Sequence, residues 1–497
     1  MTDLPTPART RFAPSPTGFV HIGSLRTVLF SWLWARHTGG QFLLRIEDTD
    51  RKRYVPGAEE QLIASLQAIG MQWDEGPLVG GPHAPYHQSQ RLEIYQRYAA
   101  ELEAKGVAYR SYIRGDEIEQ LNQERVERGE PKLLSFRDLP GIDNAARAAA
   151  GEPYTLRLAM RTSGQTVLND LIRGPIVFEN ATLGMPDPVL IKSDGFPTYA
   201  MAAMVDDHEM AITHVLRGDE WISTSPIHIQ IYEAFGWQQP VWIHVPIVLG
   251  NDGKRLSKRH GDTSITEYLD AGFLPEAIIN YLVLIGWSYD DKTEIMTIQE
   301  LIERFDLTRI RPSAGVFDRE KLLHFNGVYL RAMAPEVLVQ RIAPYLSRAG
   351  IISAAPTEAE LARVAQLLPL VQERLKLLSE APETLDFFFV RPQSYDLGVL
   401  VPKKTEPAQV VQVLQAAHAA LGQLTSWDEA STEAVLRQLT EDLGLKVGQV
   451  FMALRVAATG RTVSPGLFET LVALGQAETL VRLSNAATAL SPSLVVS

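Results

Sequence analysis

The chain has 497 residues and carries 47 Lys and Arg against 59 Asp and Glu, a formal net charge of −12. That balance excludes a uniformly basic nucleic-acid binder but not a local basic surface on an acidic body. A hydrophobic content of 45% excludes wholesale disorder, and the absence of cysteine excludes disulfides, thiolate catalysis and cysteine-ligated zinc. With no signal-peptide core and no apolar stretch long enough to span a bilayer, we expect a soluble, cytoplasmic protein without a membrane partner.

The first 50 residues predict a strand, a turn, a helix and a second strand. Residues 9–13 form the first strand candidate. From Ser24 onward, apolar residues recur at helical spacing until two glycines at 39–40 end the helix. Residues 41–46 return as a strand, so this β–α–β unit implies a parallel sheet.

The rest of the chain changes character twice. In chain order we expect helices at 58–69, 91–105, 197–208 and 225–236, strands at 154–161, 175–179, 188–192, 213–217 and 241–249, and a charged loop at 250–262. The short strands between about residues 108 and 194 interrupt the alternation and indicate an insertion. From about residue 263 the chain is mostly helical, with amphipathic runs at 358–379, 408–421 and 432–443.

A turn rich in Pro and Gly, residues 14–24, joins the first strand to the first helix. A helix start offers unpaired N–H groups and the positive end of the helix dipole, which favour an anion. Gly18 and Gly23 would let a ligand approach the main chain closely, and the imidazole of His21 could donate to a phosphate oxygen. A proline-rich turn with a packed histidine is the simpler alternative for this segment taken alone.

A second segment, residues 254–259 (KRLSKR), carries four cations directly after a loop with two glycines. Like charges this close repel one another unless a polyanion neutralises them, and a triphosphate is one such polyanion. A solvated basic loop is the more common explanation of such a run taken alone.

Together the two segments resemble a known family. Residues 21–24 (HIGS) are similar to the HIGH signature of class I aminoacyl-tRNA synthetases, and residues 255–259 (RLSKR) are similar to their KMSKS loop. Further stretches resemble glutamyl-tRNA synthetases of the bacterial type: 11–18 (RFAPSPTG), 45–50 (RIEDTD), 194–199 (DGFPTY), 205–208 (VDDH), 217–221 (RGDEW), 272–276 (GFLPE), 446–450 (KVGQV) and 464–469 (SPGLFE). The resemblance covers essentially the whole chain.

This resemblance implies an α/β Rossmann-like catalytic half, with a HUP-type parallel sheet and an α+β insertion, followed by an all-α anticodon-binding half. The implied regions are 1–100 and 195–250 for catalysis, 101–194 for the acceptor-arm-binding insertion, 251–335 for the stem-contact region with the KMSKS-like loop, and 336–497 for two helical subdomains split near 390.

The resemblance also implies a glutamate–tRNA ligase. Such an enzyme uses ATP and Mg²⁺ to form glutamyl-adenylate and then transfers the glutamyl group to the 3′ end of tRNA(Glu), so no nucleophilic side chain is expected. The implied catalytic residues are His21, Ser257 and Lys258. The implied ATP-binding residues are Ser15, Gly18, His21, Gly23, Glu220, Val248, Arg255 and Lys258.

L-Glutamate carries two carboxylates and one ammonium, so its site should present two cations and one anion. Arg11, Arg217 and Glu47 match family positions that meet this need, and arginine suits planar carboxylates. The resemblance places Ser15 beside Glu47 at the α-ammonium group and gives Tyr199 the side-chain carboxylate to orient. The arginine that takes each carboxylate stays open, and a structural ion pair is the alternative role for Arg11 and Glu47.

The chain departs from the family at two places. Ala203 stands where relatives often have Asn, so any contact from that side chain is lost or replaced. Many relatives also hold a cysteine-ligated zinc near the position of residues 109–112, and we expect no zinc here. The acidic pair Asp206 and Asp207, with His208, is explained as well by a helix surface as by a metal site, so no metal ligand is predicted.

Several alternatives are weaker. A glutaminyl-tRNA synthetase has a β-rich anticodon half, a tRNA nucleoside-modifying relative lacks the C-terminal half, and a generic nucleotidyltransferase does not need it. A non-catalytic tRNA-binding paralogue would not need both signatures. We expect a monomer that binds tRNA(Glu), with Lys446, Arg455 and Arg461 as candidate phosphate contacts. Whether tRNA(Gln) is also charged stays open.

Overall fold

A computed structural model of the chain describes residues 4–16, 22–50, 53, 55–137, 139, 142–256 and 264–491. The chain forms two compact units. The first comprises Met1–Tyr268 and Pro275–Arg319, and the second comprises Leu269–Leu274 and Glu320–Ser497. The four regions expected from the sequence divide the chain more finely than these units and stay a prediction.

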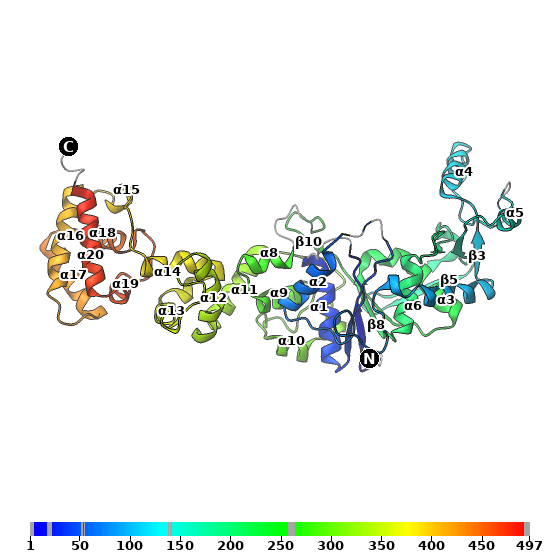
Figure 1. The fold of residues 1–497 in the computed structure, drawn as a ribbon, viewed down its shortest axis with the longest axis horizontal. Helices are drawn as coiled ribbons and strands as arrows, with labels where there is room; N and C mark the ends of the chain where they lie inside the picture. The colour runs from blue at the N-terminus through cyan, green and yellow to red at the C-terminus, as the bar shows by residue number, and fades with distance from the viewer. Residues whose placement is uncertain are drawn as a thin grey trace. The chain divides into compact units, whose positions relative to one another are not determined.

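The first unit is α/β (Figure 1). Its strands and helices are, in chain order, β1 Arg9–Phe12, α1 Ile22–His37, β2 Gln41–Leu44, α2 Ala58–Ala68, α3 Leu92–Ala104, β3 Ala108–Ser111, α4 Gly115–Glu127, α5 Asn144–Ala149, β4 Thr155–Leu158, β5 Gln165–Asp170, β6 Gly174–Glu179, β7 Val189–Ile191, α6 Tyr199–Glu209, β8 His214–Gly218, α7 Ser225–Phe235, β9 Val241–Val245, β10 Val248–Leu249, α8 Ile265–Asp270, α9 Pro275–Leu284, α10 Ile298–Arg304 and β11 Gly315–Val316.

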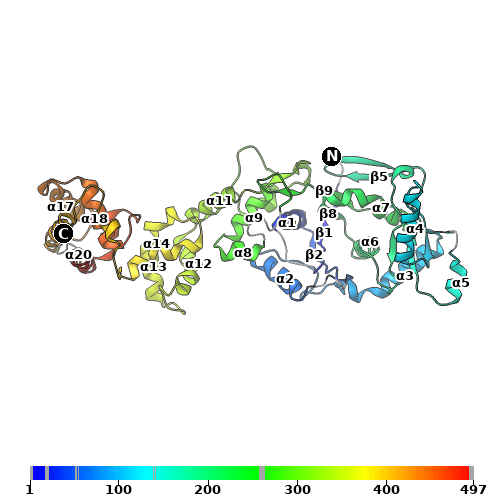
Figure 2. The same cartoon turned by 90° about the horizontal axis from the view of Figure 1, so that it is seen from above.

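The N-terminal β–α–β unit is confirmed. Strands β1 and β2 pair in parallel, from Arg9 opposite Gln41 to Phe12 opposite Leu44. Helix α1 between them is apolar around most of its circumference and mostly buried, as expected for a helix that is packed on several sides. The backbone N–H of Thr213 donates to the carbonyl of Arg9, which brings the start of β8 beside β1 (Figure 2).

A four-stranded sheet has the order β6-β5-β9-β8. Strands β8 and β9 are parallel and joined by α7, which starts with Pro226 in its first turn and ends at Gly236 in the left-handed conformation, as the sequence predicts. Strand β5 joins β9 in parallel at Asp170, whereas β6 is antiparallel to β5. The sheet is therefore mixed rather than purely parallel, and two strands from the expected insertion belong to it.

The remaining strands of the expected insertion, β3, β4 and β7, form an antiparallel sheet. Helices α4 and α5 follow β3, and Arg147 on α5 donates from both terminal nitrogens to the carboxylate of Glu117 on α4, at 2.9 and 2.6 Å. This pairing holds the two short helices together without a metal ligand in the contact.

Two expected elements are broken by proline. The strand expected at 241–249 is divided at Pro246 into β9 and β10, because proline has no N–H to donate to a sheet. The helical run expected at 358–379 ends at Val371, two residues after Pro369, and a short turn at Gln372–Arg374 follows.

The second unit is helical, as predicted. Its helices are α11 Arg319–Ala332, α12 Pro335–Arg348, α13 Glu358–Val371, α14 Ala381–Phe389, α15 Leu397–Leu400, α16 Pro407–Gly422, α17 Glu429–Asp442, α18 Val447–Thr459, α19 Leu467–Leu474 and α20 Gln476–Leu490. Buried Arg482 on α20 donates to the carbonyls of Phe387 on α14 and Ala458 on α18, both at 2.7 Å. One side chain thus joins three helices.

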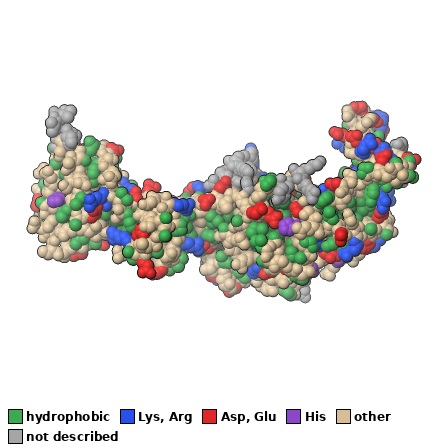
Figure 3. All heavy atoms as spheres, in the orientation of Figure 1, with side chains coloured by type: hydrophobic (Ala, Val, Ile, Leu, Met, Phe, Trp, Pro, Cys, Tyr) green, Lys and Arg blue, Asp and Glu red, His purple; other side chains and the backbone are tan. Residues whose placement is uncertain are grey.

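On the face of the molecule in Figure 3, Lys and Arg side chains are interspersed with Asp and Glu, so this face carries no single basic field. None of the helices in the described part of the chain is long and apolar enough to cross a membrane.

Candidate active site

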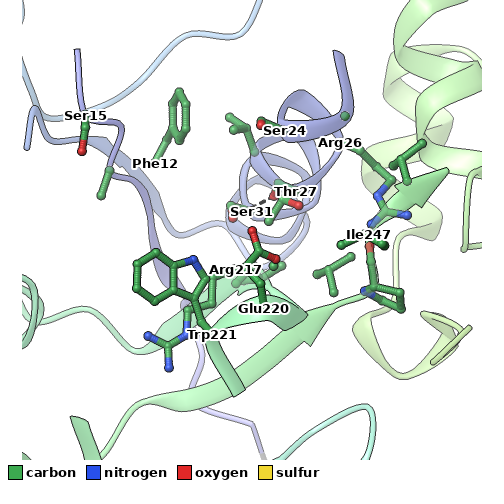
Figure 4. A pocket seen from close by; sticks show the side chains of 18 of the residues that line it. Phe12, Ser15, Ser24, Arg26, Thr27, Ser31, Arg217, Glu220, Trp221 and Ile247 are labelled. Atoms are coloured by element: carbon green, nitrogen blue, oxygen red, sulfur yellow. Dashed lines mark hydrogen bonds between the residues drawn. The ribbon is translucent and has the colours of Figure 1, made fainter. Parts of the chain in front are cut away.

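A pocket of about 650 Å³ opens at the carboxyl ends of β1, β8 and β9 (Figure 4). Ligands in open α/β sheets bind at this edge, where strand directions bring loop side chains together. The start of α1, with Ser24 and Thr27, faces Glu220 and Trp221 across the pocket. The site is therefore built from segments that are far apart in the chain, from Arg11 to Leu256.

All nine predicted site residues that the structure describes line this pocket: Arg11, Ser15, Gly23, Glu47, Tyr199, Arg217, Glu220, Val248 and Arg255. The other four predicted residues, Gly18, His21, Ser257 and Lys258, lie outside the described residues. The individual roles of all thirteen stay predictions.

Arg217 on β8 is buried without an acidic partner. Its Nε donates to Nε2 of His244 at 3.0 Å, and its Nη2 contacts Oγ of Ser225 at 3.2 Å and Nδ1 of His228 at 3.1 Å. Its Nη1 has no hydrogen-bond partner among the described residues, although the side chain is only 6% exposed. Burial lowers the pKa of Arg217, and nearby Arg11 lowers it further. Because a buried charge is costly unless it is paired, this guanidinium favours binding of an anion.

Arg11 on β1 differs from Arg217 because it already has an acidic partner. Its Nε and Nη2 donate to the two carboxylate oxygens of Asp207 at 3.1 and 3.3 Å, and its Nη1 donates to the carbonyl of Leu216 at 3.3 Å. The ion-pair alternative for Arg11 is thus realised in this structure with Asp207 rather than with Glu47. Arg11 also lines the pocket.

Arg45 shares the partner Asp207 with Arg11 and is completely buried. Its Nη1 donates to Asp207 at 2.8 Å and its Nη2 to Glu47 at 3.0 Å. On the other side of Arg45, Asp206 accepts hydrogen bonds from Arg91 at 2.8 Å and from Tyr95 and Gln88. Three arginines and three carboxylates therefore balance one another in this network, and Arg217 stands outside it.

The helix-surface explanation of Asp206 and Asp207 is wrong. Both side chains have no exposed area, whereas the next residue, His208, is exposed. Burial raises the pKa of Asp207, but Arg11 and Arg45 outweigh it, so that this pKa lies below its usual value. A single sequence shows the charges but not that arginines more than 150 residues away reach them.

Glu47 is the carboxylate of this network that also lines the pocket. Burial raises its pKa to about 7, against the opposing effect of Arg45. Only one of its oxygens accepts a hydrogen bond from Arg45. A cation such as an ammonium group that entered the pocket beside Glu47 would stabilise its ionised form.

Four of the predicted nucleotide-binding residues, Gly23, Glu220, Val248 and Arg255, line the pocket. A Cβ placed on Gly23 would meet only ordinary contacts, 3.8 Å from Val248 and 3.9 Å from Leu256, so protein packing alone does not demand glycine there. Arg255 pairs with Glu220 at 3.3 Å and has an exposed side chain. The ring of Trp221 lies 4.5 Å from that of Tyr199, and both residues line the pocket.

Sequence reasoning missed Arg26, His228 and His244. Arg26 on α1 is buried and lines the pocket, and it donates to the carbonyls of Ile285 and Pro246. Burial lowers its pKa to about 10. The available signal is a polar residue inside an otherwise apolar element, namely Arg26 in α1 and His244 in β9.

Two of the three candidate phosphate contacts in the helical unit are engaged within that unit. Arg461 donates to Asp386 at 2.8 and 2.9 Å, and Arg455 donates to the carbonyl of Ser464 at 3.1 Å. Lys446 is exposed at the start of α18. The sequence does not distinguish these three cations.

Comparisons with known proteins agree with one another along the chain. The family described as "tRNA synthetases class I (E and Q), catalytic domain" matches residues 7–324, and the family described as "Anticodon binding domain" matches residues 337–487. A glutamate–tRNA ligase from Herpetosiphon aurantiacus is 72% identical over 495 residues and is covered completely, as is this chain. One from Roseiflexus castenholzii is 51% identical over 98% of this chain and 97% of its own length.

A solved structure has the same fold. The crystal structure of a glutamate tRNA ligase from Elizabethkingia meningosepticum in complex with its amino acid superposes with a TM-score of 0.88 at 34% identity, covering 97% of this chain and 99% of that one. The expected Rossmann-like catalytic half and helical anticodon-binding half are thus confirmed. The chain belongs to the glutamate–tRNA ligase family of class I aminoacyl-tRNA synthetases.

Proposed function

We propose that the pocket at the ends of β1, β8 and β9 binds L-glutamate and MgATP side by side and forms glutamyl-adenylate. The observation that carries this proposal is Arg217: a residue that lines the pocket, whose buried guanidinium faces no carboxylate among the described residues and whose Nη1 has no hydrogen-bond partner among them. We assign the side-chain carboxylate of glutamate to Arg217: this carboxylate would supply the missing anion, and the side-chain amide of glutamine would not.

The charges around Arg217 fit the rest of the amino acid. Glu47 would receive the α-ammonium group, with Ser15 beside it on the same wall of the pocket. Arg11 would offer its remaining N–H groups to a carboxylate while Asp207 holds it in place. Tyr199, stacked near Trp221, would orient the side-chain carboxylate.

The chemistry needs positioning and charge stabilisation rather than a nucleophilic side chain. An oxygen of the α-carboxylate attacks the α-phosphorus of ATP, the new P–O bond forms, and the bond to pyrophosphate breaks. Mg²⁺ enters with the ATP phosphates as part of the substrate. His21 and the start of α1 would hold the phosphates, and Lys258, with Ser257, would neutralise charge on the departing pyrophosphate. The 3′-terminal ribose hydroxyl of the tRNA then attacks the acyl carbon and AMP leaves.

The partners of this reaction are tRNA(Glu), L-glutamate and ATP. The helical unit would contact the anticodon arm and residues 101–194 the acceptor arm. We further propose that the enzyme acts in the cytoplasm as a monomer. Charging assays with purified tRNA(Glu) and tRNA(Gln) decide whether the second tRNA is also a substrate.

The test is ATP–pyrophosphate exchange by the purified enzyme with tRNA present, with glutamate and glutamine compared. We expect exchange with glutamate, and a kcat/KM at least about 100-fold lower with glutamine, because glutamine leaves a buried charge unpaired. Comparable efficiency with the two amino acids would overturn the role of Arg217. No exchange with any amino acid would favour a non-catalytic tRNA-binding protein.

A further inference from the structure

We propose that Asp170 and His244 are positioning residues for Arg217, and that they act with His228 and Ser225 to hold its guanidinium by neutral acceptors only. The charge of Arg217 is thereby kept available for a substrate carboxylate. We call His244, His228 and Ser225 the neutral cage of Arg217, and we propose that it helps the enzyme to select glutamate over glutamine. The inference rests on the proposed function of Arg217 in binding glutamate.

The first step of the argument is the fixed relation between Arg217 and His244. The two residues are paired in the parallel register of β8 and β9. Nε of Arg217 donates to Nε2 of His244 at 3.0 Å, and Nδ1 of His244 contacts Oδ2 of Asp170 at 2.8 Å. All three side chains are at least nine-tenths buried. A chain of two hydrogen bonds therefore runs from the end of β5 to the pocket.

Asp170 determines which nitrogen of His244 carries the proton. Its Oδ1 accepts from the backbone N–H groups of Ile172 and Arg173 at 3.0 and 2.9 Å, and its Oδ2 accepts from the backbone N–H of His244 at 2.9 Å. Both oxygens thus face donors, and the contact with the imidazole requires a proton on Nδ1. Nε2 is left with its lone pair directed at Arg217, as required for an acceptor.

The second step concerns charge. Burial lowers the pKa values of both His228 and His244, and Arg217 lowers them further, while Asp170 opposes this for His244. Both imidazoles are thus neutral at pH 7. The uncharged ring of Trp242, whose centroid lies 4.8 Å from the guanidinium of Arg217, adds a cation–π contact.

The contrast with Arg11 shows why neutrality matters. Arg11 faces the carboxylate of Asp207, so its charge is largely compensated within the protein. Arg217 donates a similar number of hydrogen bonds, but to imidazole and hydroxyl groups, none of which carries a negative charge. The side-chain carboxylate of the substrate is therefore the group that completes the ion pair, and the neutral side-chain amide of glutamine cannot do so.

A matched pair of variants separates charge from shape. His228→Asn keeps a neutral acceptor near the position of Nδ1, and His228→Asp has the same size with a negative charge. KM values for glutamate and ATP are measured by pyrophosphate exchange with tRNA present, and the folding of each variant is checked by thermal unfolding. We expect the KM for glutamate to be at least about 10-fold higher in His228→Asp than in His228→Asn, with KM values for ATP within about 2-fold of each other.

A second pair tests the positioning chain. In Asp170→Asn an amide N–H₂ replaces one of two oxygens that both face donors, so we expect the KM for glutamate to rise by about 3- to 10-fold and the KM for ATP to change by less than about 2-fold. His244→Gln, which can place an amide oxygen near Nε2, should retain more glutamate affinity than His244→Ala.

The outcomes separate the two proposals. Absence of exchange in the unmodified enzyme contradicts the proposed function itself. Normal exchange in the unmodified enzyme, together with equal KM values for glutamate in the two His228 variants, overturns the neutral cage. An equal rise of both KM values in folded Asp170→Asn, or no advantage of His244→Gln over His244→Ala, overturns the positioning role.

Discussion

Arg11 and Arg217 line the same pocket, but only Arg11 is paired with an acid of the protein, the carboxylate of Asp207 at 3.1 and 3.3 Å. The two guanidinium groups therefore differ in how far their charge is compensated by the protein. One is pre-oriented and largely compensated, and the other is held by neutral groups. Several measurable consequences follow from this difference and from the network behind it.

The first prediction concerns Asp207. Asp207→Asn removes the charge that pairs with both Arg11 and Arg45, and leaves two buried cations undercompensated. We expect a loss of about 3–5 kcal/mol in the free energy of unfolding, as is typical when one partner of a buried pair is removed. Chemical denaturation measures it. Glu60→Gln, at an exposed position on α2, is the control and should change stability by less than about 0.5 kcal/mol. Similar stabilities of the two variants would contradict the network.

The second prediction is a pH dependence set by Glu47. Burial raises the pKa of Glu47 to about 7, so the carboxylate is ionised above that pH and becomes protonated below it. The ammonium of glutamate binds the ionised form and keeps its own charge from pH 6 to 8.5. The KM for glutamate should therefore rise as pH falls through 7, approaching about tenfold per pH unit, while the KM for ATP changes little. Glu47→Gln should show a high KM for glutamate without this dependence, and a parallel pH profile in that variant would exclude Glu47 as its source.

The third prediction separates Lys258, in the KMSKS-like loop, from Lys254, directly before that loop. Lys258→Ala should reduce the rate of adenylate formation by about 100- to 1,000-fold if Lys258 has the proposed role of neutralising charge on the departing pyrophosphate. Lys254→Ala, four residues earlier and exposed, should stay within about 3-fold of the unmodified rate. The rates of both variants are measured by ATP–pyrophosphate exchange with tRNA present. Equal rates for the two variants would remove the special role of Lys258.

The fourth prediction concerns tRNA binding. Because this acidic chain must bind a polyanion through local cations, its tRNA affinity should fall steeply with salt through counterion release. Lys446→Ala should reduce the slope of log K against log salt by about 0.9, the loss of one phosphate contact. Arg461, which pairs with Asp386, should affect stability rather than this slope when it is replaced by Ala. A tRNA affinity that does not change with salt would argue against tRNA as the partner.

The elements that depend on local sequence could be predicted. The β–α–β unit at the N-terminus, helix α7 with its proline start and glycine end, and the helical second unit follow from periodicity and capping residues. The division at Pro246 was missed, because the strand was expected to run unbroken from 241 to 249, although proline cannot donate within a sheet.

Contacts between distant segments could not be predicted. Asp207 and Arg45 are 162 residues apart in the chain, and Asp170 meets His244 across 74 residues only because β5 joins β9 in the mixed sheet. Motifs placed Arg11, Glu47 and Arg217 in one site, but no pattern in a single sequence indicates which of them already has an internal partner. Burial of a charge depends on packing, which periodicity does not encode.

Arg26 has a mechanical consequence. Its buried guanidinium donates to the carbonyls of Pro246 and Ile285 and thereby ties α1 to two other segments of the first unit. Arg255, by contrast, is exposed and contacts Glu220 across the mouth of the pocket. The pocket therefore combines a buried anchor at Arg26 with an exposed ion pair at Arg255, and we expect adjustment to a substrate to occur at the exposed pair.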